Sequence, residues 1–414
     1  MTLPSTPLTL LRCSLALFII SPLINVGPVN IGAFLLLLSS LLWLSINPGR
    51  WWGFWREHLQ LLLLLMSVLL AIFFMANQLN ALDTPMEATF AQGRWLILLT
   101  LAAPAIARGV DVDAWKKILQ FAVISVLFAV TTYCLDAALY LGWDSNLVLN
   151  LLDAQRSDPL RPSWVFNPHP FSRTLIAALL LLIGALTLTE NRRVKQACLL
   201  GTLGLGVMLL LGAVRTALLS LAVIAAYAWI AQGRGRALVG LLAGLLLGVV
   251  SLWVRAFIFP QQDPDRSLQF RIALFEQGMQ AFQEKPWLGG GYQAARRILW
   301  PENLQAFMAS QTLATSNTHV QWLEMLVSYG VIGGGLFLAV WAASGWLVVQ
   351  AQRQATRPLR LAALLLLLNW ISLTVAGFTT VFRESEWALW IVTLLAASWL
   401  LEQRGLSSAA GSDR

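Results

Sequence analysis

The chain has 414 residues, of which 58% are apolar and only 12% are charged. A soluble domain carries about a quarter of its residues as charged side chains, so this composition excludes an ordinary soluble protein. The apolar residues gather in runs of about 20, the length of helix that crosses a bilayer core of roughly 30 Å. We therefore expect an all-α polytopic membrane protein.

In chain order, the apolar runs predict about 12 membrane-spanning helices, near residues 10–26, 31–47, 59–77, 94–108, 117–140, 171–189, 196–213, 216–232, 237–259, 331–351, 361–380 and 387–402. The first nine helices occupy residues 1–259, and the last three occupy residues 331–402 before a polar tail at residues 403–414. The first run lacks a basic flank and a convincing cleavage site. It is therefore expected to stay in the protein as a helix and not to be removed as a signal peptide.

The short connectors between these runs alternate in charge. One set carries most of the basic residues, among them Arg50, Arg108, Arg192, Arg234 and Arg357. Lys and Arg concentrate in short cytoplasmic loops, so this set predicts the cytoplasmic side and places both termini there. The formal net charge of +8 is then mostly an orientation signal and does not indicate nucleic-acid binding.

Two segments on the opposite side are too long to be simple turns, one at about residues 141–170 and the other at 260–330. Loops longer than about 15 residues in a compact structure are usually functional or disordered. The second segment contains apolar and aromatic residues throughout, including Phe275, Trp287 and Trp300. This content favours a folded lid on the non-cytoplasmic side, with short helices at the membrane surface.

Arg215 is the first candidate for chemistry. It lies between two predicted helices, in a stretch without acidic residues from Asn191 to Phe259. An arginine that snorkels from a helix end to the interface needs no partner. However, a tight outward turn would also place the guanidinium beside an external cavity, where an anionic ligand is a natural counter-ion.

His319 is the second candidate. It opens a helical stretch at the end of the large outer segment, with Leu323, Leu326 and Gly330 at helical spacing. Imidazole is the side chain best suited to take a proton near neutral pH. A purely structural, hydrogen-bonded histidine is the alternative.

The third candidate group is basic and lies in the two outer segments. Planar guanidinium groups match phosphate oxygens in a bidentate manner, and several together can hold a pyrophosphate. Some of these arginines are instead expected to pair with nearby carboxylates at the surface. Asn167 and His169 lie in a proline-rich stretch that leads into a helix, so they are expected to line the same cavity. The arginines are Arg266, Arg271, Arg296 and Arg297 in the larger segment, with Arg161 and Arg173 flanking the smaller one.

Other motifs give weaker signals. The stretch from Lys285 to Tyr292 is rich in glycine, but it lacks the Gly-Lys-Ser/Thr ending of a nucleotide loop and predicts a tight bend under the lid. No His, Cys or acidic cluster has metal-ligand spacing, so no metal or cofactor is expected. Cys13, Cys134 and Cys198 lie in apolar runs and are expected to be buried as small apolar side chains.

Together these motifs resemble the O-antigen ligase and polymerase superfamily of bacterial envelope glycosyltransferases. Arg215 lies between two outer helix ends, and Arg271 precedes a Pro-hydrophobic-Gly-x-Gly turn. His319, followed by Gly330 and Gly333, is similar to the ligase motif of a His, a polar residue, nine residues and Gly-x-x-Gly. Val320 departs from that motif at its polar position, beside Gln321.

The resemblance implies a GT-C-like arrangement in the bacterial inner membrane, with a periplasmic active site. It implies transfer of a glycan from undecaprenyl pyrophosphate, without a nucleotide sugar or a metal. The acceptor is a sugar hydroxyl of lipid A–core in a ligase, and another lipid-linked repeat unit in a polymerase. Arg215 and Arg271 are expected to stabilise the departing diphosphate, with His319 as general base.

A polymerase is the nearest alternative to a ligase. A transporter of lipid-linked sugars belongs to a different class, which usually carries ionisable relays or broken helices near the middle of the membrane. Here the polar clusters are predicted at one face, which disfavours transport.

Overall fold

A computed structural model describes residues 5–23, 26–79, 93–141, 168–211, 215–230, 264–291, 318, 320–355, 359–378 and 380–412. Within these ranges all regular secondary structure is helical, which confirms the prediction of an all-α fold. The N-terminal half contains α1 (Ser5–Ile20), the short 3-10 helix η1 (Ser21–Leu23), α2 (Val26–Ile46), α3 (Pro48–Glu57), α4 (Leu59–Leu79), α6 (Arg94–Gly109) and α7 (Val112–Leu141). These helices are followed by α9 (Pro168–Leu188), α10 (Arg192–Leu211), α11 (Arg215–Ile230), α13 (Pro264–Glu284), α16 (Gln321–Gln354), α17 (Arg360–Gly377) and α18 (Glu384–Ser412).

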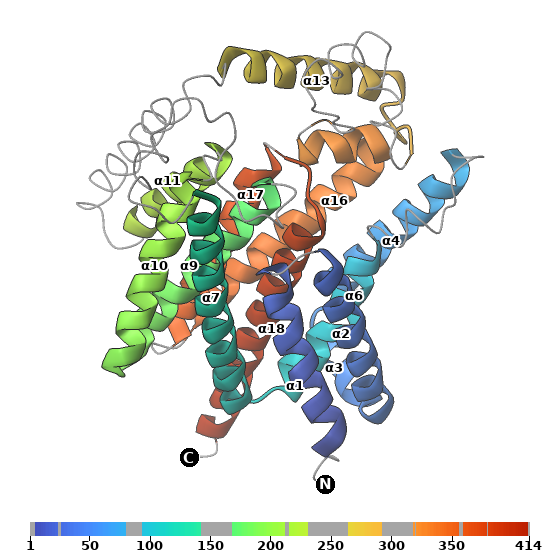
Figure 1. Ribbon diagram of the computed structural model, residues 1–414. Helices are drawn as coiled ribbons and strands as arrows, with labels where there is room; N and C mark the ends of the chain where they lie inside the picture. The colour runs from blue at the N-terminus through green and yellow to red at the C-terminus, as the bar shows by residue number, and fades with distance from the viewer. Residues whose placement is uncertain are drawn as a thin grey trace.

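Most of these helices run along a common direction as a bundle (Figure 1). The helix α13 instead lies across one end of the bundle, while α1 begins and α18 ends near the opposite end (Figure 1). We call these the α13 end and the termini end. The arrangement separates the predicted lid from the two ends of the chain.

Four of the described helices are long and apolar enough to cross a membrane: Pro28–Ile46, Val112–Thr132, Gln321–Gln354 and Arg360–Gly377. A fifth span results if Pro48–Glu57 and Gln60–Ala71, which meet at 97°, are counted as one bent span. These helices support a polytopic membrane protein. The expected total of about 12 spans stays a prediction, and the run at 237–259 lies outside the described residues.

Buried apolar side chains form two main clusters. The larger one joins α1, α2, α3, α4, α6 and the start of α7 to α16, α17 and α18. The smaller one joins the rest of α7 to α9, α10, α11 and Leu368 of α17. Within the larger cluster, Trp341 stacks on Trp390 with ring centroids 5.7 Å apart and an angle of 14° between the planes. Large apolar side chains such as Phe128 and Leu70 face out of the bundle, as expected for helices that contact lipid.

The termini end is held by charged side chains. Arg108 of α6 donates from Nε to Glu402 of α18 and from Nη2 to Glu57 of α3, both at 2.8 Å. Its Nη1 also donates to the backbone carbonyl of Arg50 at 3.0 Å. One guanidinium therefore ties three helices together.

The cysteines differ from the sequence-based expectation. Cys198 of α10 is fully buried, as predicted, but Cys13 is exposed on the outer face of α1. The prediction for Cys13 was wrong because an apolar run of a membrane helix has a face toward lipid as well as a face toward the core.

Candidate active site

Several helices begin together at the α13 end. The backbone N–H of Phe382, just before α18, donates to Oε1 of Gln321, the first residue of α16, at 2.7 Å. Arg94 at the start of α6 forms an ion pair with Glu384 at the start of α18. The start of a helix carries a partial positive charge and unpaired N–H groups, so helix starts gathered in one place favour an anionic ligand.

Arg173 connects α9 and α11 at this end. Its side chain is only 1% exposed, and its Nη1 donates to the Ser220 hydroxyl at 2.8 Å. The carboxylate of Glu386, in the first turn of α18, attracts the same guanidinium electrostatically. A buried charge therefore lies where the N-terminal turns of α9, α11 and α18 approach one another.

A buried carboxylate organises the chain where it enters α16. The backbone N–H of Thr318 donates to Oε2 of Glu324 at 3.0 Å, and the Thr318 hydroxyl lies 3.1 Å from the same oxygen. That hydroxyl also lies 2.9 Å from the carbonyl oxygen of Val320 and accepts from the Val320 N–H at 3.3 Å. Thr318 and Glu324 are both buried. Residues 318 and 320 are therefore fixed by one compact group of hydrogen bonds, which we call the Thr318–Glu324 clamp.

The helix α16 is broken at Gly330, where φ is 63° and ψ is −168°. The glycine-rich turn after α13, residues 286–291, docks onto this break. Its N–H groups and carbonyls pair with the groups that the break leaves without helical partners. The four hydrogen bonds are Gly290 N–H to Val327 O (2.8 Å), Gly291 N–H to Ser328 O (2.9 Å), Val331 N–H to Pro286 O (2.7 Å) and Ile332 N–H to Trp287 O (3.2 Å).

The docking requires glycine on both sides. A Cβ at Gly330 would lie 2.3 Å from the carbonyl carbon of Trp287, and a Cβ at Gly289 would lie 2.5 Å from the backbone nitrogen of Gly330. Gly289 and Gly291 also have φ values of 73° and 87°. The tight bend predicted from the sequence is therefore confirmed, and its partner is the broken helix.

Comparison with known proteins matches the same part of the chain. Residues 199–338 match the family model described as O-antigen ligase. The resemblance to the O-antigen ligase superfamily is confirmed. An O-antigen ligase of Pseudomonas aeruginosa is 28% identical over 221 residues, which cover 50% of this chain and 49% of that protein. The chain thus aligns with about half the length of this curated relative.

The O-antigen ligase match runs from α10 into α16 and includes Arg215, Arg271 and His319. Arg215 begins α11, so its backbone lies at the helix start that Ser220 ties to Arg173. Arg271 lies on α13, which packs against α16 and leads into the docked turn. His319 lies outside the described residues, but both of its neighbours belong to the clamp.

The other predicted site residues are placed less completely. His169 lies in the first turn of α9 and Arg266 in the first turn of α13, where the structure describes only the backbone. The remaining ones, Arg161, Asn167, Arg296 and Arg297, lie outside the described residues. The structure therefore brings several helix starts together at the α13 end, and the predicted roles of the named residues stay predictions.

Sequence reasoning missed two buried polar groups at the α13 end, Arg173 and Glu324. Arg173 was recognised only as a flanking arginine, although an arginine within an apolar helix is a signal for function. Glu324 carried a similar signal, as an acidic residue in the first turn of α16 beside apolar neighbours. Neither side chain could be assigned a partner until the helices were assembled.

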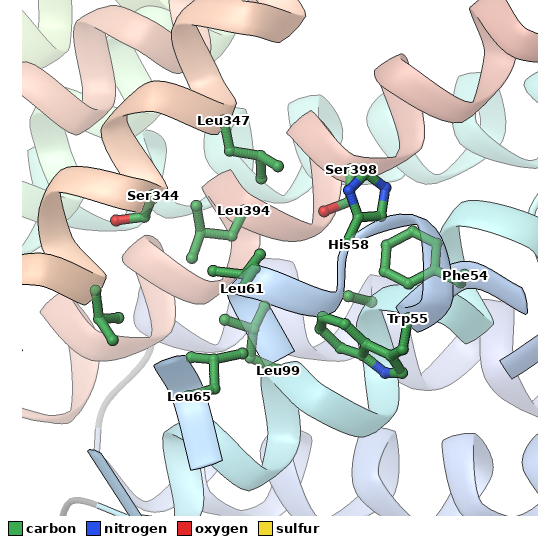
Figure 2. A pocket seen from close by; sticks show the side chains of 12 residues that line it. Phe54, Trp55, His58, Leu61, Leu65, Leu99, Ser344, Leu347, Leu394 and Ser398 are labelled. Atoms are coloured by element: carbon green, nitrogen blue, oxygen red, sulfur yellow. The ribbon is translucent and has the colours of Figure 1, made fainter. Parts of the chain in front are cut away.

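No group of three His, Cys, Asp or Glu residues in the described part of the chain could hold a metal ion. A separate pocket, shown in Figure 2, lies between α3, α4, α6, α16 and α18. Phe54, Trp55 and His58 line it together with Ser344 and Ser398. Its lining is mainly apolar and contains no Arg, Lys, Asp or Glu, so it does not match a site for a lipid pyrophosphate.

Proposed function

We propose that this protein is a glycosyltransferase at the periplasmic face of the bacterial inner membrane. It transfers O-antigen glycan from undecaprenyl pyrophosphate to a sugar hydroxyl of lipid A–core. The O-antigen ligase match over residues 199–338, which spans Arg215, Arg271 and His319, is the observation that carries this proposal. The helix starts joined at the α13 end support it, because they favour the anion that such a donor presents.

In the proposed reaction His319 takes the proton of the acceptor hydroxyl. The acceptor oxygen forms a bond to the anomeric carbon of the donor as the bond from that carbon to the phosphate oxygen breaks. Arg215 and Arg271 stabilise the negative charge that develops on the leaving diphosphate. A single displacement of this kind inverts the configuration at the anomeric carbon and requires no metal.

Further polar residues are proposed to hold the donor. Guanidinium groups bind phosphate oxygens in a bidentate manner, and amide and imidazole groups add hydrogen bonds. The apolar faces of the bundle would admit the polyprenyl chain from the membrane. The residues assigned to donor binding are Arg161, Asn167, His169, Arg266, Arg296 and Arg297.

The first test is His319→Ala in purified protein reconstituted into nanodiscs, supplied with lipid-linked donor and lipid A–core. Loss of a general base costs on the order of 10²–10⁴ in rate, so we expect transfer to be nearly abolished while the protein stays inserted. Arg215→Ala is expected to weaken donor use. Transfer by His319→Ala at the unaltered rate would remove this residue from the mechanism.

A polymerase is the second candidate, because Val320 stands where the ligase motif has a polar residue. The same assay separates the two activities. A ligase caps lipid A–core with the glycan, whereas a polymerase elongates the donor and leaves lipid A–core unchanged. In a deletion strain, a missing ligase leaves polymer on its lipid carrier, and a missing polymerase leaves core with a single repeat.

A further inference from the structure

We infer that Glu324 is a positioning residue, which holds the backbone on both sides of His319 through the Thr318–Glu324 clamp. The inference rests on the proposed function, since it takes His319 as the general base. It goes beyond that function by assigning a role to a carboxylate that does not itself touch the substrate.

The burial of Glu324 is the first argument. The residue is 8% exposed, and its helical neighbours Leu323 and Val327 pack into an apolar cluster with Leu274 of α13. A buried carboxylate is unfavourable unless hydrogen bonds compensate for its lost hydration. In the described structure its partners are the N–H and hydroxyl of Thr318. The described compensating contacts of this buried side chain therefore all go to the short segment before α16.

The geometry of the segment is the second argument. The Thr318 hydroxyl contacts both the carbonyl and the N–H of Val320. One side chain therefore links the residues on either side of position 319. The bond from Phe382 N–H to Gln321 Oε1 anchors the next residue to the chain before α18. The backbone before and after position 319 is thus held without any ligand. Such pre-organisation matters because a displacement of about 1 Å at a reacting group can cost about 100-fold in rate.

A direct catalytic role for Glu324 makes a different prediction from positioning. Glutamine keeps an oxygen that can accept from Thr318, but it cannot exchange a proton. Positioning therefore predicts that Glu324→Gln retains most of the activity, while Glu324→Ala loses it.

The experiment measures kcat and the KM for the lipid-linked donor in nanodiscs. We expect Glu324→Ala to lower kcat by about 10- to 100-fold with little change in KM, and Glu324→Gln to stay within about threefold of the unaltered protein. Thr318→Val should resemble Glu324→Ala, and the double variant Thr318→Val/Glu324→Ala should be no worse than either single one. Equal losses for Glu324→Gln and Glu324→Ala would overturn the inference.

A matched control is Glu402→Ala, which removes a hydrogen-bonded glutamate at the termini end. This variant is expected to lower thermal stability and to leave kcat per folded protein unchanged. If Glu402→Ala lowers kcat as much as Glu324→Ala does, the effect at position 324 is one of general stability and the inference fails.

Chemical rescue separates positioning from folding. In His319→Gly, added imidazole is expected to restore part of the transfer rate. Since free imidazole is not attached to the chain, adding Glu324→Ala should leave the rescued rate unchanged. The inference fails if Glu324→Ala lowers the imidazole-rescued rate of His319→Gly by the same factor by which it lowers the rate of the protein that retains His319.

The outcomes also distinguish this inference from the proposed function. Full activity of His319→Gly would refute the proposal that His319 is the general base. The Thr318–Glu324 clamp would then be tested separately, by hydrogen exchange of the Thr318 amide. That amide should exchange slowly in the unaltered protein and quickly in Glu324→Ala, and equal exchange would refute the clamp. Inactive His319→Gly beside fully active Glu324→Ala would refute only the inference.

Discussion

At the scale of single residues, Gly330 shows why a particular amino acid is needed. Its φ of 63° and ψ of −168° lie in a region that essentially only glycine adopts. Its missing Cβ also leaves room for the Trp287 carbonyl group. The backbone conformation and the close approach of Trp287 therefore both require glycine at position 330.

We predict that Gly330→Ala destabilises the protein by at least about 1–3 kcal/mol, the usual cost of holding a residue in such a conformation. The matched control is Gly335→Ala on the same helix, where an added Cβ meets nothing within 4 Å. Alanine is favoured over glycine inside a helix by about 1 kcal/mol, so this control should be neutral or stabilising. Thermal unfolding in detergent measures both, and equal melting temperatures for the two variants would contradict the prediction.

Residue type alone led to the prediction of the candidate site. The order of Arg215, Arg271 and His319 could be recognised because each has chemistry that stands out in an apolar sequence. The hydrogen bonds of Arg173 and Glu324 could not be predicted, because their partners Ser220 and Thr318 are ordinary polar residues. The importance of such pairs can be recognised only when the structure shows that both side chains are buried.

At the scale of elements, α3 differs most from the sequence-based expectation. Its residues were interpreted as part of a cytoplasmic connector, but they form a helix from Pro48 to Glu57. Tertiary contacts stabilise so short a helix, since isolated helices of this length are marginal. The indole N–H of Trp55 donates to the Thr100 carbonyl at 3.0 Å, and Arg108 binds Glu57. Such distant partners cannot be seen in a local pattern.

We predict that Arg108→Met loosens α3 from the bundle. The guanidinium is 17% exposed, and its loss leaves the mostly buried carboxylate of Glu402 without its cation. We expect a loss of about 1–3 kcal/mol in stability, with unchanged transfer activity per folded molecule. Thermal unfolding and the nanodisc assay test this, and Lys116→Met is a control because its ion pair with Asp113 is exposed. A melting temperature equal to that of the control would contradict the prediction.

At the scale of the whole molecule, the fold has two ends with different polar contacts. The Arg108 ion pairs hold the termini end, and the α13 end carries the joined helix starts, with the Arg94–Glu384 ion pair, and the docked turn. The apolar runs predicted most helices because span length is a local property. How the helices cross and which starts meet depend on packing between distant segments, so these features could not be read from the runs.

The proposed orientation is testable by labelling in a variant without its own cysteines, made by Cys13→Ser, Cys134→Ala and Cys198→Ala. Gln283→Cys on α13 and Glu190→Cys before α10 each add one exposed thiol. With a membrane-impermeant maleimide, we expect Gln283→Cys to react in intact spheroplasts and Glu190→Cys only after permeabilisation. The reverse pattern would place α13 in the cytoplasm and refute the periplasmic site.

The docked turn also bears on how the protein is made. Residues 286–291 leave the ribosome before Gly330 does, so the partners for the broken helix are synthesised first. Backbone groups that enter lipid without a partner cost several kcal/mol each. The backbone groups that pair with the break in α16 are therefore already present in the nascent chain when the break itself is synthesised.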